Sequence, residues 1–202
     1  MIIPLRHSRT IPRRGFLRAS GQLTAALALA GLPAPLLAAA PALRFGPAQP
    51  FDFDWLIGHA REMARRPYDP PPRPAPDVVH QIDYDAHGKL RTWPEMALWS
   101  TSGGVYPISF VHMGRFFPKT VRLHAIDGRE AREIVYAPDY FTMPPDHVAR
   151  QLPADASAFA GFWVQESRRA GSWPKREPWV TFSGASYFRA VGDLGQVGMS
   201  AR

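Results

Sequence analysis

The feature that most constrains this chain is a series of short segments rich in β-branched and aromatic residues, separated by Gly, Pro, Asp and Ser. They span residues 78–85, 105–114, 119–126, 132–137, 159–166, 179–184 and 186–191. Runs of this length, bounded by turn residues, predict β-strands. Asp127-Gly128 lies between two of them and predicts a type I′ hairpin turn. We therefore predict an all-β, mainly antiparallel fold, a sandwich or a barrel.

One helix is predicted beside these strands, in "FDFDWLIGHAREMARRPY" (51–68). Its apolar residues recur at helical spacing, Asp52 or Asp54 can cap its start, and Pro67 ends it. We expect its apolar face to pack on a sheet. The face comprises Phe53, Leu56, Ile57, Ala60, Met63 and Ala64. The proline-rich stretch 69–76 then predicts an extended connector.

The first 42 residues predict an export signal. Arg13 and Arg14, followed by Phe16 and Leu17, precede an apolar run over 23–40 and then small residues. This order resembles a twin-arginine signal, which an export machinery reads. The alternative is a membrane anchor, but Gly and Pro interrupt the run before it can span a bilayer. We predict cleavage, location in the periplasm and no permanent membrane anchor.

The charge distribution argues against a nucleic-acid partner. The formal net charge is +7, but five of the 24 basic residues fall in the first 42 positions, which hold no acid. The rest of the chain carries 19 basic and 17 acidic residues without a basic stripe. The chain has no cysteine, which excludes disulfides and thiol nucleophiles.

Motifs for metal or nucleophile chemistry are incomplete. A calcium loop starting at Asp83 would need Glu at its twelfth position, where Pro94 stands. A serine-hydrolase elbow around Ser186 would need glycine at Phe188 and a later histidine, yet the last one is His147. The histidines have no ligand spacing. We predict no cofactor, no metal site and no catalytic residue in this chain.

The aromatic residues leave two interpretations open. Tryptophan and tyrosine rings stack on the C–H faces of sugars, but the same residues dominate ordinary cores. The set comprises Trp93, Trp99, Trp163, Trp173, Trp179, Tyr187 and Phe188.

Several motifs between Phe51 and Arg202 resemble the periplasmic glucan biosynthesis family OpgG/OpgD (MdoG/MdoD), and the twin-arginine signal favours its OpgD branch. They are "ARRPYDPP", "IDYDAHGKLR", "ALW", "FVHMGRFF", "LPADASAFAGF", "GASYFR" and "VGMSAR". Two positions depart from the family pattern. Trp163 stands where arginine is expected, and Met199 replaces leucine.

The resemblance implies a galactose-mutarotase-like β-sandwich followed by an immunoglobulin-like domain, acting on β-1,2-glucan. Residues 43–202 would form the N-terminal portion of the sandwich, without the second domain. Some relatives resemble inverting glycoside hydrolases, which use two carboxyl groups. The family pattern places that pair beyond this chain, which leaves an enzymatic role for this chain undecided. Tyr187 and Arg189 are the expected glycan-binding residues.

Three hypotheses follow from these observations. The first is the N-terminal part of a glucan biosynthesis or processing protein, with β-glucan and the twin-arginine machinery as partners. The second is a non-catalytic carbohydrate-binding module. The third is a nonfunctional remnant, whose open sheet edges would favour aggregation. The strand-like end of the chain at Met199–Arg202 suggests a sheet that continues.

Overall fold

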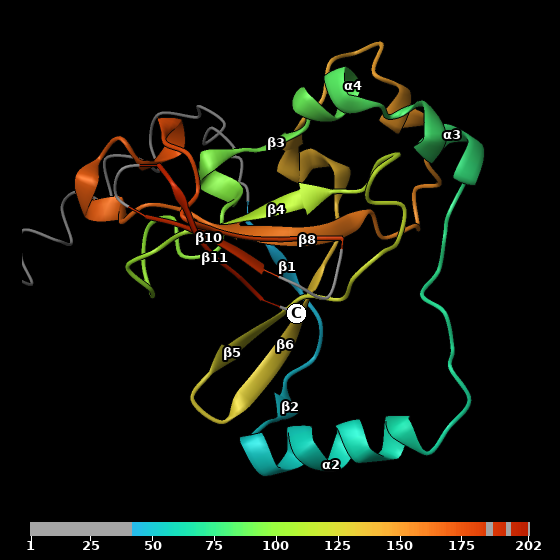
Figure 1. Ribbon diagram of the computed structural model, residues 1–202, viewed down its shortest axis with the longest axis vertical. Helices are drawn as coiled ribbons and strands as arrows, with labels where there is room; N and C mark the ends of the chain where they lie inside the picture. Colours follow the sequence, from blue (N-terminus) through green and yellow to red (C-terminus); the bar gives the residue numbers. More distant parts are fainter. Residues whose placement is uncertain (1–41, 185–187, 193–194, 202) are drawn as a thin grey trace, which may run out of the picture. The chain divides into compact units, whose positions relative to one another are not determined.

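The computed structural model describes residues 42–184, 188–192 and 195–201 (Figure 1). The chain divides into two units, Met1–Ala40 and Pro41–Arg202, and all elements described belong to the second. Several residues singled out in the sequence lie outside the described residues. They are Arg13, Arg14, Phe16 and Leu17 of the predicted signal, and Tyr187 of the expected glycan site.

The largest sheet has five antiparallel strands in the order β11-β10-β9-β8-β4. The prediction of a mainly antiparallel β fold is confirmed, and four of these strands fall within predicted segments. The fifth, β11, contains Met199 and pairs with β10. The bounds are β4 Ile108–His112, β8 Phe159–Val164, β9 Val180–Ser183, β10 Phe188–Val191 and β11 Val197–Ala201.

Shorter strands form two further sheets. Strand β6 (Glu130–Val135) pairs with β1 (Arg44–Phe45), β2 (Gln49–Pro50) and β5 (His124–Asp127), and β3 (Arg91–Thr92) pairs with β7 (Phe141–Thr142).

The predicted hairpin joins β5 and β6, and Asp127 pairs with Glu130 across a two-residue loop. Gly128 has φ +57°, whereas Arg129 is not in the left-handed region. The hairpin is therefore confirmed. The predicted type I′ turn is wrong, because that turn needs two left-handed residues.

The predicted strand at 78–85 is wrong, because this segment forms two short helices (Figure 1). Helix α3 (Pro76–Gln81) starts with proline, whose fixed φ suits a first helical turn. Helix α4 (Tyr84–Gly88) is capped by Asp83, which accepts a hydrogen bond from the Ala86 N–H at 3.0 Å. The proline start of α3 and the Asp83 cap of α4 outweighed the β-branched residues on which the strand prediction rested.

Five 3-10 helices complete the elements of the described residues. They are η1 (Pro94–Met96), η2 (Pro138–Tyr140), η3 (Val148–Gln151), η4 (Arg168–Ala170) and η5 (Trp173–Lys175).

The predicted helix is confirmed as α2 (Phe53–Ala64), but its expected packing is not. Asp52 caps it by accepting a hydrogen bond from the Trp55 N–H at 2.8 Å. None of its residues is buried, and Phe53 and Met63 are more than half exposed. The next segment, residues 67–75, forms no helix or strand, as the proline content predicts.

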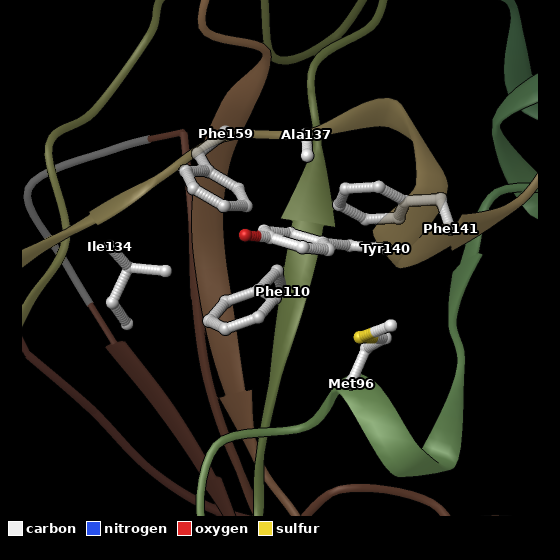
Figure 2. Packing of buried hydrophobic residues seen from close by; sticks show 7 residues of the cluster. All are labelled: Met96, Phe110, Ile134, Ala137, Tyr140, Phe141 and Phe159. Carbon is white, nitrogen blue, oxygen red and sulfur yellow. The ribbon is translucent and has the colours of Figure 1, made fainter. Parts of the chain in front are cut away.

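The core lies between β4, β8 and the segments that carry β6 and β7. Figure 2 shows the rings of Phe110, Tyr140, Phe141 and Phe159 packed together, and Phe110 and Phe159 have centroids 4.9 Å apart. The β4–β8 register shifts where His112 pairs with Phe159 and Val111 pairs with Gly161. This bulge places Phe159 beside Phe110 on the core face.

Candidate functional site

The five-stranded sheet has two chemically different faces. On one, the register places Phe110, Phe162, Phe182 and Phe188 opposite one another across β4, β8, β9 and β10. The rings of Phe162 and Phe182 stack with centroids 4.7 Å apart. Because successive strand residues point to opposite faces, the neighbouring row projects to the other side of the sheet.

That other row contains Ser109, Trp163, Thr181 and Arg189, from the same four strands. Arg189 is exposed, while Trp163 and Thr181 are half-buried. The expected glycan residue Arg189 therefore shares a face with an aromatic ring and a hydroxyl group. Phe188 lies on the opposite face and does not accompany it.

Trp163 lines three adjoining hollows on this face. The largest has a volume of about 620 Å³, and the other two have about 250 Å³ each. A fourth hollow of about 640 Å³ shares Glu177 and Pro178 with the smaller two. We call these four hollows together the groove. Its principal side chains are Arg91, Phe117, Trp163, Glu177, Trp179 and Arg189.

Contacts from two other strands fix the Trp163 ring. Its Nε1–H donates a hydrogen bond to the Ser183 hydroxyl on β9 at 3.3 Å. The Arg91 guanidinium, from β3, lies over the ring with its central carbon 5.4 Å from the centroid, a cation–π contact. Arg91 Nε also donates to the Gly88 carbonyl at 3.2 Å. A guanidinium is therefore present beside Trp163, the position where the resemblance led us to expect an arginine.

The groove combines groups that suit a polyhydroxylated ligand. Trp163 and Trp179 offer flat apolar surface, and Thr181 and Ser183 offer hydroxyls. Trp179 is held by Tyr106, whose ring lies edge-on with centroids 5.7 Å apart. Fixed aromatic rings among a few polar groups are typical of sites that orient a ligand. Because the hollows adjoin, the groove suits an extended ligand.

The other predicted aromatics have different surroundings. Trp173 is 8% exposed and is a core residue by this measure, although its edge reaches the groove. Trp99 lines a separate hollow beside Ile126, and Trp93 is 44% exposed without lining a described hollow. The core interpretation is therefore confirmed for Trp173, while stacking on sugars stays a prediction for Trp163 and Trp179, which line the groove.

Sequence reasoning missed Arg91, Arg115 and Glu177 as groove residues. The two arginines belong to the motifs "IDYDAHGKLR" and "FVHMGRFF", which were matched without assigning a role to either. Those motifs could have indicated them. Nothing in the sequence around Glu177 separates it from other surface carboxylates.

His112 is a structural residue of the core. His112 is fully buried, its Nδ1–H donates to the Met113 carbonyl at 2.8 Å, and its Nε2 accepts from the Tyr136 hydroxyl at 3.1 Å. Burial lowers the pKa of His112 to about 4, despite the carbonyl bond. Burial also raises the pKa of the Tyr136 hydroxyl. A neutral His112 satisfies both partners and belongs to the core.

The described residues contain neither a metal-binding cluster nor a membrane-spanning helix. No three His, Asp or Glu side chains gather in a way that could hold a metal ion. Within the same ranges, no helix has the length and apolar character needed to cross a bilayer.

Comparison with known proteins links most of the chain to one family. The model of the family "Periplasmic glucan biosynthesis protein, MdoG" matches residues 51–202. Glucans biosynthesis protein D 2 of Ralstonia nicotianae is 48% identical over 193 residues, covering 94% of this chain. Glucans biosynthesis protein D is 36% identical in Xanthomonas campestris and 34% in Xylella fastidiosa, each over 94% of this chain. The chain spans 35% of the length of each of these relatives.

Proposed function

The chain belongs to the family of periplasmic glucan biosynthesis proteins, and from this premise we propose that its groove binds the β-1,2-linked backbone of a periplasmic glucan. The observation that carries the proposal is the position of Trp163. It lines three adjoining hollows, and its ring is fixed by Ser183 and Arg91. A fixed ring at the junction of hollows provides a stacking surface for one glucose unit while its neighbours extend to either side.

Polar groups around Trp163 support the same role. Thr181 pairs with Trp163 along the register row and Arg189 pairs with Thr181, and Glu177 lines the same hollow as all three. Arginine donates several hydrogen bonds in a fixed geometry, and a carboxylate accepts them, so the two complement sugar hydroxyls. Arg189 therefore remains our glycan-binding residue, and Trp163 joins it.

The family also supports a location and a domain arrangement. We infer that residues 1–42 are a cleaved twin-arginine signal and that residues 43–202 act in the periplasm. We further infer that residues 43–202 are the N-terminal portion of a galactose-mutarotase-like sandwich domain. We assign hydrolysis to no residue of this chain.

Calorimetric titration with linear β-1,2-gluco-oligosaccharides tests the proposal. We expect the full chain to bind them and to bind β-1,4-linked glucose oligomers of equal length more weakly. A folded, monodisperse chain that binds neither would overturn the proposal. An aggregated product would support the remnant hypothesis, and release of reducing ends would show that the chain is itself catalytic.

A further inference from the structure

The hollow of about 620 Å³ differs from the rest of the groove in its charge. Among the described residues that line it, Arg91 and Arg115 are positively charged and none is Asp or Glu. The neighbouring hollows all include Glu177. One end of the groove is therefore cationic, and we call this hollow the arginine pocket.

Both guanidiniums are held through Nε, and within the described residues their terminal nitrogens make no hydrogen bond, so they can contact a ligand. Arg91 Nε donates to the Gly88 carbonyl at 3.2 Å, and Arg115 Nε donates to the His80 carbonyl at 2.7 Å. Among the described residues, neither arginine takes part in an ion pair. Guanidinium groups fixed in this way and lacking a carboxylate partner suit an oxyanion.

His87 contributes little charge to the arginine pocket near neutral pH. Its Nε2–H donates to the His112 carbonyl at 2.7 Å. Burial is the largest influence on the His87 pKa and lowers it, opposed by the carbonyl bond and reinforced by Arg91. Asp83, which lies between the lining residues Ile82 and Tyr84 in the sequence, is engaged in capping α4 through the Ala86 N–H. Arg91 and Arg115 therefore determine the charge of the arginine pocket.

The rest of the arginine pocket is apolar and aromatic. Trp163, Phe117 and Ile82 line it, and the ring of Phe117 lies 5.6 Å from that of His87 between centroids. Gly184 has φ +64°, and a Cβ there would lie 2.5 Å from Phe117 Cδ1, so glycine allows this close packing. A ligand here meets an aromatic surface for its body and two guanidiniums for its charge.

We propose that the arginine pocket binds an anionic group, such as a phosphate ester or a carboxylate, carried by a sugar. The proposal rests on the proposed function for one source of the ligand, a charged substituent on the glucan that occupies the groove. The second source is a free sugar phosphate, and it does not require glucan binding. Both share an oxyanion attached to a pyranose ring.

The test compares glucose 6-phosphate with glucose by NMR titration of the full chain. We expect glucose 6-phosphate to bind at least tenfold more tightly, with an affinity that falls as salt is raised. Arg91→Gln and Arg115→Gln should each weaken its binding about tenfold, as expected for the loss of a charged hydrogen bond. Arg61→Gln removes the same charge from an exposed position on α2 and should change nothing.

A second titration separates the two sources and the two proposals. A β-1,2-gluco-oligosaccharide bearing 6-phosphate groups should bind more tightly than the neutral oligosaccharide, and Arg115→Gln should remove only that difference. Binding of the neutral oligosaccharide without any phosphate preference would overturn the arginine pocket and leave the proposed function standing. Arginine-dependent binding of glucose 6-phosphate alone would retain the pocket and refute glucan binding. Equal effects of Arg61→Gln and Arg115→Gln would also refute the pocket.

Discussion

Gly161 on β8 lies directly against the backbone of β9, and replacing it with alanine should destabilise the sheet. Its φ is +156°, and a Cβ at this position would lie 1.9 Å from the Phe182 carbonyl oxygen. Real Cβ atoms stay at least 3.0 Å from such atoms. The obstacle is backbone of the neighbouring strand, so side-chain rotation cannot relieve it.

The expected loss of stability follows from the backbone movement that an added Cβ would require. Separating β8 from β9 by roughly 1 Å lengthens several ladder hydrogen bonds, each worth about 1 kcal/mol net. A non-glycine residue at a sparsely populated φ adds about 1–3 kcal/mol. We therefore expect Gly161→Ala to lower the free energy of unfolding by about 4 kcal/mol or more, a large part of the roughly 5–15 kcal/mol of a typical domain.

Urea denaturation followed by tryptophan fluorescence measures this loss. Gly171→Ala is the matched control, because Gly171 has φ +62° but nothing within 4 Å of an added Cβ. The control should cost about 1 kcal/mol, which is the backbone preference alone. If Gly161→Ala stayed within 1 kcal/mol of Gly171→Ala, the close approach of β8 and β9 would be refuted.

Three further predictions concern the core and the surface. Burial lowers the pKa of His112 to about 4, below its unfolded value of about 6.5. The contribution of neutral His112 to the free energy of unfolding is therefore complete above pH 6.5 and is lost as the pH falls toward 4, by about 3 kcal/mol in all. In His112→Asn the urea midpoint should change less between pH 6.5 and pH 4 than in the unmodified chain. An equal change in both would contradict the assignment of this pH dependence to His112. Tyr140→Phe removes the acceptor of the Arg44 N–H at 2.6 Å and should cost about 1 kcal/mol in urea denaturation. Arg122→Ala breaks an exposed ion pair with Glu133 and should shift stability by less than about 1 kcal/mol, so a loss above 2 kcal/mol would contradict its exposure.

The strands were predictable because turn residues bound short β-branched runs, as at Asp127-Gly128 between β5 and β6. The strand prediction at 78–85 was wrong because it relied on β-branched residues such as Val79 and Ile82. In the structure these two residues are buried at helical spacing. The expected packing of α2 was inferred from its apolar face alone. An amphipathic pattern gives no information about whether a partner surface is present.

The site was predictable only in part for a topological reason. Arg189 was found from a motif, but its row partners Ser109 and Trp163 come from distant segments that only the register brings together. Trp163 was noted as a departure from a pattern, without any indication of which face it occupies. Its contact with Arg91 spans 72 positions in the sequence and depends on β3 lying beside the sheet.

The most direct test of the account is the affinity of Trp163→Ala for a linear β-1,2-gluco-oligosaccharide, measured by calorimetry beside the unmodified chain. Trp55→Ala is the control, since Trp55 is 46% exposed on α2 and lines no part of the groove. Loss of a stacking ring predicts an affinity about 10- to 100-fold lower for Trp163→Ala, with a circular dichroism spectrum like that of the unmodified chain. Trp55→Ala should bind normally. Unchanged affinity of a folded Trp163→Ala variant, or an equal loss in both variants, would contradict the assignment of the groove to glucan.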